Sequence, residues 1–328
     1  MTQLNSCSAK IYYQTALDLG LKAEIIDNEG YLKISDNKQS FFFVKSKTPL
    51  NNQPAVVVSH NKQLSCQLIA KEKIPIPEYI VINKEENLSQ AVKKIGFPLV
   101  AKPNIGGGGE FVFTQLKTLR QVLTAFRLAK RKYTNIIIEK YSSAVDFRLL
   151  VLDGQVIGAL KRQPPQVIGN GQATIQQLIK KENRKRIRKY RQQGTDLKNR
   201  IVLSKFSQQL LKNKGWQLTS IPPKNQTVVL KGKANVSTGG SCQTVNKEFF
   251  HPSIVKTVVK ISQILDLRLT AVDLLIKDPK KPFNQENGLF LETNTAVGLS
   301  AFYYPNSGQE QKAALPILKS LFSLKSSL

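Results

Sequence analysis

The sequence predicts a mixed α+β protein built from more than one lobe. Apolar residues recur at helical spacing in some segments and in short strand-like runs in others, with turn residues between them. Asp153-Gly154 joins two alternating apolar runs, which is a strong signal for a β-hairpin. The 328 residues, 41% of them hydrophobic, are enough to bury a substantial core in a compact unit of two or three lobes.

Both ends of the chain carry local patterns of their own. Residues 1–58 predict a small αβ lobe. Its expected elements are a helix at 11–20 and strands at 23–27, 31–35 and 41–45. Residues 59–92 predict a connecting helix and strand. Apolar spacing predicts a core helix at 254–265, entered through His251-Pro252, and a closing amphipathic helix at 313–324.

Two apolar runs near the C-terminus carry oxygen-bearing side chains. The run 269–276 contains Asp273, and the run 288–295 contains Glu292 and Asn294, which leave the same face of a strand. A carboxylate in an apolar strand is costly unless a cation or hydrogen bonds compensate it. Oxygen ligands suit Mg²⁺ that is shared with substrate phosphates. We therefore interpret these side chains as candidate metal ligands, with exposed polar positions on an edge strand as the alternative.

A glycine run follows a strand that ends in a lysine. Lys102 closes a strand-like run, four glycines follow at 106–109, and a second strand-like run comes after them. Glycines let backbone N–H groups turn toward a phosphate, and the lysine adds charge. No Gly-Lys-Ser/Thr follows, so the loop is not a Walker A loop. The pattern predicts a flexible flap over a triphosphate, with an ordinary surface turn as the alternative.

Charged residues also lie at the ends of the next predicted strands. Glu139 ends a strand, where the following backbone could meet an adenine edge. Arg148, Lys161 and Arg162 lie on the predicted hairpin and present cations for phosphates. Solvated strand ends are the alternative for each of them taken singly.

The order of these motifs resembles that of the ATP-grasp superfamily of carboxylate–amine ligases. The chain is similar in particular to the ATP-grasp portion of cyanophycin synthetase and related peptide and γ-glutamyl ligases. The strings at 161–179, 228–245 and 249–255 carry this narrower resemblance, which runs from about Ser59 to about Ala301.

The resemblance implies an ATP-grasp fold, in which two αβ lobes grip ATP, in addition to the small N-terminal lobe. It places the flap lobe at 93–142 and the second lobe at 143–328. A helical, basic insert is expected at 165–225 within the second lobe.

The resemblance also implies roles for single residues. The nucleotide-binding positions are Lys62, Lys102, Gly106, Gly107, Gly108, Gly109, Glu139, Lys140 and Tyr141. The catalytic positions are Arg148, Arg162 and Asn235, the last in an NxSTGG loop that continues through Ser237 to Gly240. Asp273, Glu292 and Asn294 match ligands of Mg²⁺. Two Mg²⁺ ions, or Mn²⁺ as a substitute, would bridge the β- and γ-phosphates of ATP.

A ligase of this type transfers the γ-phosphoryl group to a carboxylate, and an amine then attacks the acyl phosphate to give an amide, ADP and phosphate. The protein supplies positioning and charge neutralisation. No Ser-His-Asp or Cys-His apparatus is needed, in keeping with only two histidines, His60 and His251.

The segment 294–308 departs from the cyanophycin synthetase pattern, in which a Gly-Pro-Gly-like turn and a histidine follow the metal asparagine. Acceptor-facing residues lie there in the family, so the acid and the amine stay open, with acidic amino acids or peptides among the candidates. The string is closer to the end of D-alanine–D-alanine ligases. With no Mur-ligase-like domain and no GxxGKT/S, we expect something other than a complete cyanophycin synthetase.

The composition of the chain indicates the cellular location to expect. Three widely spaced cysteines argue against a disulfide framework, and a cytoplasmic location is expected. The N-terminus lacks an apolar h-region, and no run approaches the roughly 18 apolar residues that span a bilayer. Since oligomers are common among relatives, a homodimer is a further expectation.

The formal net charge of +27 is not explained by the resemblance. Basic residues concentrate at 180–191, with Glu182 as the single acid. The cluster is interpreted in three ways: a solvated basic insert, a contact with nucleic acid or an anionic membrane, or attraction of an acidic substrate such as an oligo-aspartyl or γ-glutamyl peptide.

Three functional hypotheses follow. The first is an ATP-dependent carboxylate–amine ligase, and the second is an ATP-grasp phosphotransferase that stops at a phosphorylated product. Amine dependence of ADP release separates these two. The third is a basic polyanion- or nucleic-acid-binding protein on a degenerate ligase scaffold. Salt-sensitive binding without ATP turnover would support this third hypothesis.

Overall fold

The computed structural model describes residues 4–193, 195, 199–232 and 234–324. The chain divides into two compact units. Unit 1 combines three separate stretches of sequence, and unit 2 combines the two stretches between them. The stretches of unit 1 are Met1–Ile76, Phe147–Lys161 and Gln243–Leu328, and those of unit 2 are Pro77–Asp146 and Arg162–Cys242.

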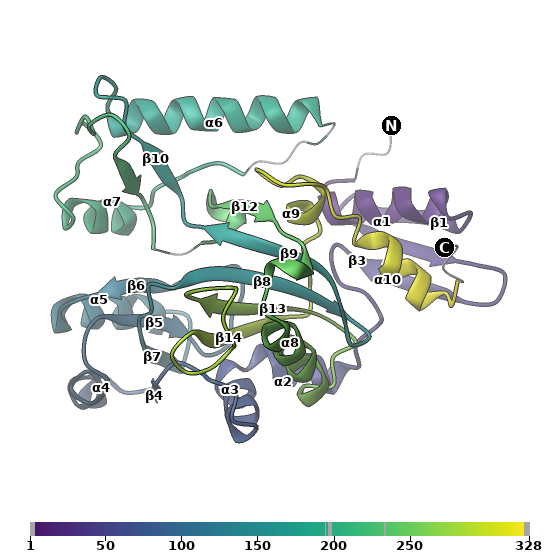
Figure 1. Ribbon diagram of the computed structural model, residues 1–328, viewed down its shortest axis with the longest axis horizontal. Helices are drawn as coiled ribbons and strands as arrows, with labels where there is room; N and C mark the ends of the chain where they lie inside the picture. Colours follow the sequence, from purple (N-terminus) through teal and green to yellow (C-terminus); the bar gives the residue numbers. More distant parts are fainter. Residues whose placement is uncertain (1–3, 194, 196–198, 233, 325–328) are drawn as a thin grey trace. The chain divides into compact units, whose positions relative to one another are not determined.

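The first part of unit 1 is a helix packed on a three-stranded antiparallel sheet of order β1-β2-β3 (Figure 1). These elements are α1 (Cys7–Asp18), β1 (Lys22–Asp27), β2 (Tyr31–Ser35) and β3 (Ser40–Val44). The ring of Tyr12 on α1 packs 5.1 Å from that of Phe43 on β3, centroid to centroid. The closing helix α10 (Ala314–Leu321) packs against α1. The predicted N-terminal elements and the closing helix are therefore present.

A five-stranded sheet of order β12-β9-β8-β13-β14 has most of its residues in unit 1 (Figure 1). Its strands are β8 (Val145–Leu152), β9 (Gln155–Gln163), β12 (Ser241–Thr244), β13 (Leu269–Ile276) and β14 (Gly288–Asn294). The β8–β9 turn is Asp153-Gly154, with φ of 45° and 75°. Two positive φ values match the type I′ turn that suits the twist of a hairpin. The predicted hairpin is thereby confirmed.

Three helices pack against β13 and β14. They are α2 (Gln53–His60), α3 (Lys62–Lys71) and α8 (Pro252–Ile264). On α8, Ile254, Val258 and Ile261 are fully buried, and His251 caps the helix by accepting a hydrogen bond from the Ser253 N–H. The predicted core helix with its His-Pro entry is confirmed.

Unit 2 contains a four-stranded antiparallel sheet of order β4-β7-β5-β6, covered by two helices. These elements are β4 (Tyr79–Ile82), α4 (Leu88–Ile95), β5 (Leu99–Pro103), β6 (Phe113–Leu116), α5 (Leu119–Lys130) and β7 (Ile136–Lys140). Leu99 and Ile138 from the sheet pack with Val92 and Phe126 from the helices in one apolar core. The antiparallel β5–β6 pair confirms that a hairpin flanks the glycine run.

The remainder of unit 2 holds the long helix α6 (Ile175–Gln192), the helix α7 (Lys205–Lys212) and the two-stranded sheet of β10 (Gln166–Ile168) and β11 (Thr227–Val229). A capping box of Thr174 and Gln177 begins α6. Ile175 and Leu178 pack in a small core with Leu211 and Val228.

Short elements complete the described chain. They are α9 (Ser300–Tyr303) and 3₁₀ turns at Glu85–Asn87, Val236–Thr238 and Lys247–Phe249. Among the described residues, no helix is long and apolar enough to cross a membrane.

Candidate active site

Strand register in unit 1 brings the three candidate metal ligands together. Asp273 on β13 lies directly opposite Glu292 on β14, and Asn294 is two residues further along. Cross-strand partners share a face, so all three side chains leave the same side of the sheet. The Asn294 amide donates a hydrogen bond to Asp273 Oδ2 over 3.2 Å. A β-bulge directly follows Asp273, a distortion that often marks functional sites.

Cations compensate the two carboxylates. Arg148 on the neighbouring strand β8 donates from Nε and Nη2 to the two Asp273 oxygens over 2.7 and 2.8 Å. Asp273 is 1% exposed, so this two-pronged ion pair offsets a large desolvation cost. Lys62, at the start of α3, places Nζ 3.8 Å from Glu292 Oε2. The sequence predicts a catalytic role for Arg148 and a nucleotide-binding role for Lys62, and in the structure both side chains contact the acidic cluster.

The donor set fits a divalent cation. Asp273 and Glu292 offer carboxylate oxygens and Asn294 an amide oxygen, which are the hard ligands that Mg²⁺ takes. The candidate set therefore consists of two carboxylates and one amide. Mg²⁺ takes six ligands, so three protein side chains would leave positions for water and phosphate oxygens. The Asp273 carboxylate already has one cationic partner, the guanidinium group of Arg148.

In unit 2, Lys102 and Glu139 form a buried ion pair. Strands β5 and β7 are neighbours, and Lys102 Nζ lies 2.7 Å from Glu139 Oε2. Each side chain is only 9% exposed. The structure therefore brings these two predicted nucleotide-binding residues together.

The next two residues make separate contacts. The Lys140 ammonium donates to the carbonyl oxygens of Phe97, at 2.8 Å, and Gly96, at 3.2 Å. The Tyr141 hydroxyl accepts a hydrogen bond from Gln115 Nε2 over 2.9 Å. The side chains of Lys140 and Tyr141 thus stabilise the local fold through these hydrogen bonds.

Arg162 on β9 has its own acidic partner. Its Nε and Nη2 donate to one oxygen of Asp146, over 2.8 and 2.5 Å. Arg162 is 7% exposed, so Asp146 balances a nearly buried charge. The structure brings Arg162 to Asp146, whereas Arg148 is bound to Asp273.

The glycine loop is open on one side and tied on the other. Gly106, Gly108 and Gly109 have φ of 154°, 64° and 78°, values that side chains rarely adopt. A Cβ added at Gly107 or Gly108 would meet nothing within 4 Å, so backbone there faces open space. Asn235 ties the loop from the other side, since its Nδ2 donates to the Gly108 carbonyl over 2.5 Å.

A hollow of about 390 Å³ lies between this loop and the loop around Asn235. Its lining residues are Gly109, Glu110, Phe111, Val112, Phe113, Thr114, Leu128, Ser204, Ser207, Lys231, Gly232, Asn235 and Thr238. Partial burial lowers the pKa of the Lys231 ammonium, which also donates to the Thr238 carbonyl over 3.2 Å. A hydrogen bond from Lys132 lowers the pKa of the Glu110 carboxyl at the rim.

Lys231 was not among the residues predicted from the sequence. It stands four residues before Asn235, inside one of the strings that carry the family resemblance. Its position within this string was the sequence signal that could have identified Lys231. Burial in a hollow that lies against a glycine loop is what distinguishes it from the other lysines, and burial cannot be read from one sequence.

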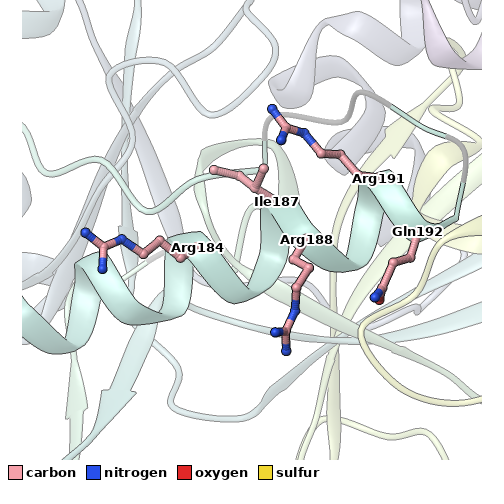
Figure 2. A pocket seen from close by; sticks show the side chains of 5 residues that line it. All are labelled: Arg184, Ile187, Arg188, Arg191 and Gln192. Atoms are coloured by element: carbon pink, nitrogen blue, oxygen red, sulfur yellow. The ribbon is translucent and has the colours of Figure 1, made fainter.

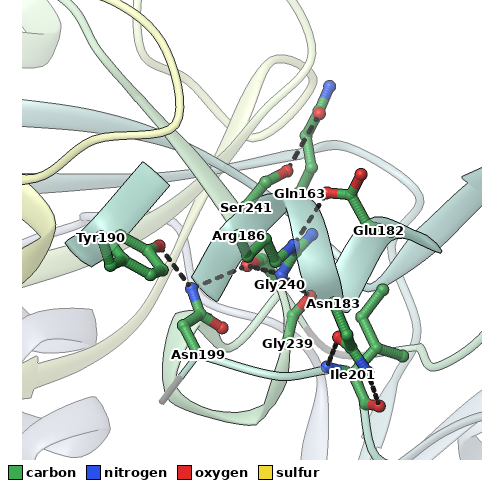
Figure 3. Close-up of polar contacts among 10 residues, drawn as sticks. All are labelled: Gln163, Glu182, Asn183, Arg186, Tyr190, Asn199, Ile201, Gly239, Gly240 and Ser241. Atoms are coloured by element: carbon green, nitrogen blue, oxygen red, sulfur yellow. Dashed lines mark hydrogen bonds and ion pairs between the residues drawn. The ribbon is translucent and has the colours of Figure 1, made fainter. Parts of the chain in front are cut away.

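The helix α6 contacts the loop that follows Asn235 through Arg186, which reaches Gly239 and Gly240 (Figure 3). Arg186 Nη1 donates to the carbonyls of Gly239, at 2.7 Å, and Gly240, at 3.2 Å, while its Nε donates to Glu182 over 2.8 Å. Asn199 adds a donor to the Gly240 carbonyl over 3.4 Å. A Cβ at Gly239 would lie 2.6 Å from the Ile201 backbone, so this close approach requires glycine.

The solvated interpretation of the basic cluster is wrong for Arg186, which is 6% exposed and bonded to the loop. The reason is its helical phase, because Arg186 lies on the same face as the buried Tyr190. The side chain of Ser237, predicted to belong to the loop, lies outside the described residues.

Comparison with solved structures identifies the fold. The bifunctional glutathione synthetase from Pasteurella multocida superimposes with a TM-score of 0.64 at 23% identity, over 98% of this chain and 45% of that one. The D-alanine–D-alanine ligase from Bacillus anthracis gives 0.51 at 15% identity, over 83% and 71%. The protein therefore has the ATP-grasp fold.

Sequence comparison finds one matching domain family and several similar proteins. Residues 59–188 match the RimK-like ATP-grasp domain. Cyanophycin synthetase from Trichormus variabilis is 30% identical over 269 residues, which cover 81% of this chain and 29% of that protein. The glutathione biosynthesis bifunctional protein GshAB from Clostridium perfringens is 26% identical over 324 residues, covering 96% and 41%. The chain thus spans less than half the length of these relatives.

Proposed function

We propose that the protein is an ATP-dependent carboxylate–amine ligase that makes a peptide or γ-glutamyl type amide through an acyl phosphate. The observation that carries the proposal is the in-register cluster of Asp273, Glu292 and Asn294 beside Arg148. A binding protein on a degenerate scaffold would have no reason to keep this costly, partly buried charge cluster.

ATP-grasp ligases use ATP and divalent metal ions. For this chain we propose two Mg²⁺ ions, with Mn²⁺ as a substitute, held by Asp273, Glu292 and Asn294. When bound, such ions neutralise charge on the β- and γ-phosphates. The oxygen-only donor set supports this choice.

The chain's own groups perform positioning and charge compensation. In the proposal, Lys102 and Glu139 orient the nucleotide, and amides of the glycine loop face its phosphates. Arg148 balances Asp273 and offers N–H donors for phosphoryl oxygens, and Lys231 adds a positive charge beside the glycine loop. Phosphoryl transfer draws most of its acceleration from such fixed donors and charges.

The substrates proposed are a small-molecule carboxylate and an amine, with amino acids and peptides as the class. The named relatives support this class, since they are a cyanophycin synthetase, a glutathione biosynthesis protein and a D-alanine–D-alanine ligase.

The test is release of ADP and phosphate from Mg²⁺-ATP, screened against pooled amino acids, dipeptides and acidic peptides. We expect release that needs both an acid and an amine, and that falls by orders of magnitude in Glu292→Gln, which keeps the shape but loses a charge. Near-normal turnover in this variant would exclude the metal role of Glu292. ADP release that needs no amine would identify a phosphotransferase instead.

A further inference from the structure

The basic helix α6 has a second face that the proposed reaction does not use. Arg184, Arg188 and Arg191 are exposed and lie at positions i, i+4 and i+7, so they share one side of the helix. Figure 2 shows their side chains leaving the helix with the guanidinium groups spread apart. Together with Ile187 and Gln192 they line an open hollow of about 440 Å³.

These three arginines form no ion pair with an acid among the residues that the structure describes. The single acid of the helix, Glu182, is bonded to Arg186 on the opposite face. Three guanidinium groups on adjacent turns repel one another, so an anionic partner would stabilise the arrangement.

The helix presents these charges from a fixed position. Asn183 accepts a hydrogen bond from the Ile201 N–H over 2.8 Å and donates to the Ile201 carbonyl over 3.0 Å. Arg186 fastens the same inner face to Gly239 and Gly240. The backbone under the outer arginines is therefore ordered before any partner binds, which lowers the entropic cost of binding.

The chemistry of the outer face favours phosphate groups in a regular array. Planar guanidinium forks bind phosphate through two parallel hydrogen bonds. The residues that line the hollow include no aromatic side chain on which a base could stack, and Tyr190 is buried on the inner face. Contacts of this kind read the nucleic-acid backbone and carry no base-sequence information.

We propose that the outer face of α6 binds the phosphate backbone of a nucleic-acid duplex without sequence preference. A rigid duplex holds its phosphates at fixed spacing and suits a fixed row of arginines, whereas a flexible acidic peptide would lose conformational entropy on binding. A membrane surface fits less well, because Ile187 is the only large apolar residue of the hollow and is half-buried. The net charge of +27 adds a field that draws in any dense polyanion.

The test measures binding of a fluorescein-labelled 20-base-pair duplex by anisotropy, without ATP, between 50 and 200 mM NaCl. We expect the triple variant Arg184→Gln/Arg188→Gln/Arg191→Gln to bind about tenfold or more weakly at low salt. The slope of log K against log salt should fall by about 0.9 for each lost phosphate contact. ADP release in the ligase assay should be unchanged, so this test is independent of the proposed reaction.

The matched control is Lys84→Gln/Lys93→Gln/Lys94→Gln, which removes the same charge from exposed positions of unit 2 outside α6. It should lose less than about twofold in affinity. Equal losses in both triple variants would overturn the proposal, because total charge and not this face would be responsible. Absence of duplex binding at 50 mM NaCl would overturn it, as would preferential displacement of the duplex by poly-glutamate or by anionic vesicles.

Discussion

The residues of the candidate site work as ion pairs, and most of these pairs join positions far apart in the sequence. Arg148 and Asp273 are separated by 125 positions, yet adjacent strands bring them into a two-pronged contact. Lys102 and Glu139 repeat the arrangement in the other sheet. In each pair the opposite charge offsets the cost of burying a charged side chain in a strand, because a buried ion without a partner is strongly destabilising.

Arg148→Gln should destabilise unit 1 by about 3–5 kcal/mol in the free energy of unfolding, because it leaves Asp273 buried without its cation. Adding Asp273→Asn should recover part of this loss. Urea unfolding followed by circular dichroism measures both. The control is Arg268→Gln, which breaks a similar but exposed pair with Asp153 and should cost about 0–1 kcal/mol. Equal costs for the two arginine variants would contradict the argument.

We expect Lys231 to make ATP binding depend on pH. Burial lowers its pKa, so the ammonium loses its proton at a lower pH than an ordinary lysine. The protonated form attracts phosphate, so ATP affinity should be full below the lowered pKa and fall as the pH rises through it. Lys231→Arg keeps its charge throughout this range and should abolish the fall. Calorimetric titration from pH 7 to pH 10 measures the effect, and identical profiles for both proteins would exclude Lys231 from nucleotide binding.

At the scale of elements, the helix α6 has two roles, one on each of two opposite faces. Its inner face carries Arg186, which bonds the carbonyls of the loop that Asn235 connects to the glycine flap. Its outer face carries the three exposed arginines. A single 18-residue helix therefore positions a candidate catalytic loop and displays a charged surface.

Arg186→Gln should loosen the Asn235 loop. The lost hydrogen bonds to Gly239 and Gly240 are worth about 1–3 kcal/mol, so amide hydrogen exchange at 236–241 should quicken by about tenfold or more. Arg186→Lys should restore part of the protection, and Arg188→Gln, on the exposed face, should leave exchange unchanged. If Arg186→Gln exchanges like the unmodified protein, α6 does not hold the loop.

The sequence allowed the elements to be predicted well where the signal was local. The Asp153-Gly154 turn, the His251-Pro252 helix entry and the apolar strands of 269–276 and 288–294 all follow from residues adjacent in the chain. The same-face placement of Glu292 and Asn294 follows from strand periodicity alone. Contacts across long separations, such as Arg186 with Gly239, left no local signal and could not be predicted.

At the scale of the whole molecule, the motifs that resemble ATP-grasp ligases are distributed over both units. The acidic cluster and Arg148 belong to unit 1, and the glycine loop, Lys102, Glu139 and Asn235 belong to unit 2. The order of motifs along the chain was therefore the feature that predicted the fold. The high positive charge was visible from composition, but only the structure separated buried Arg186 from the exposed arginines of the same helix.

The central claim is ligation through an acyl phosphate, and the fate of the carboxylate oxygen tests it most directly. Once the screen has identified an acid, that acid is supplied with ¹⁸O in its carboxyl group together with the amine and Mg²⁺-ATP. The released phosphate is then analysed by mass spectrometry. Attack of the carboxylate on the γ-phosphorus followed by amide formation should leave one ¹⁸O in each phosphate. Unlabelled phosphate, or label found in AMP, would contradict the account.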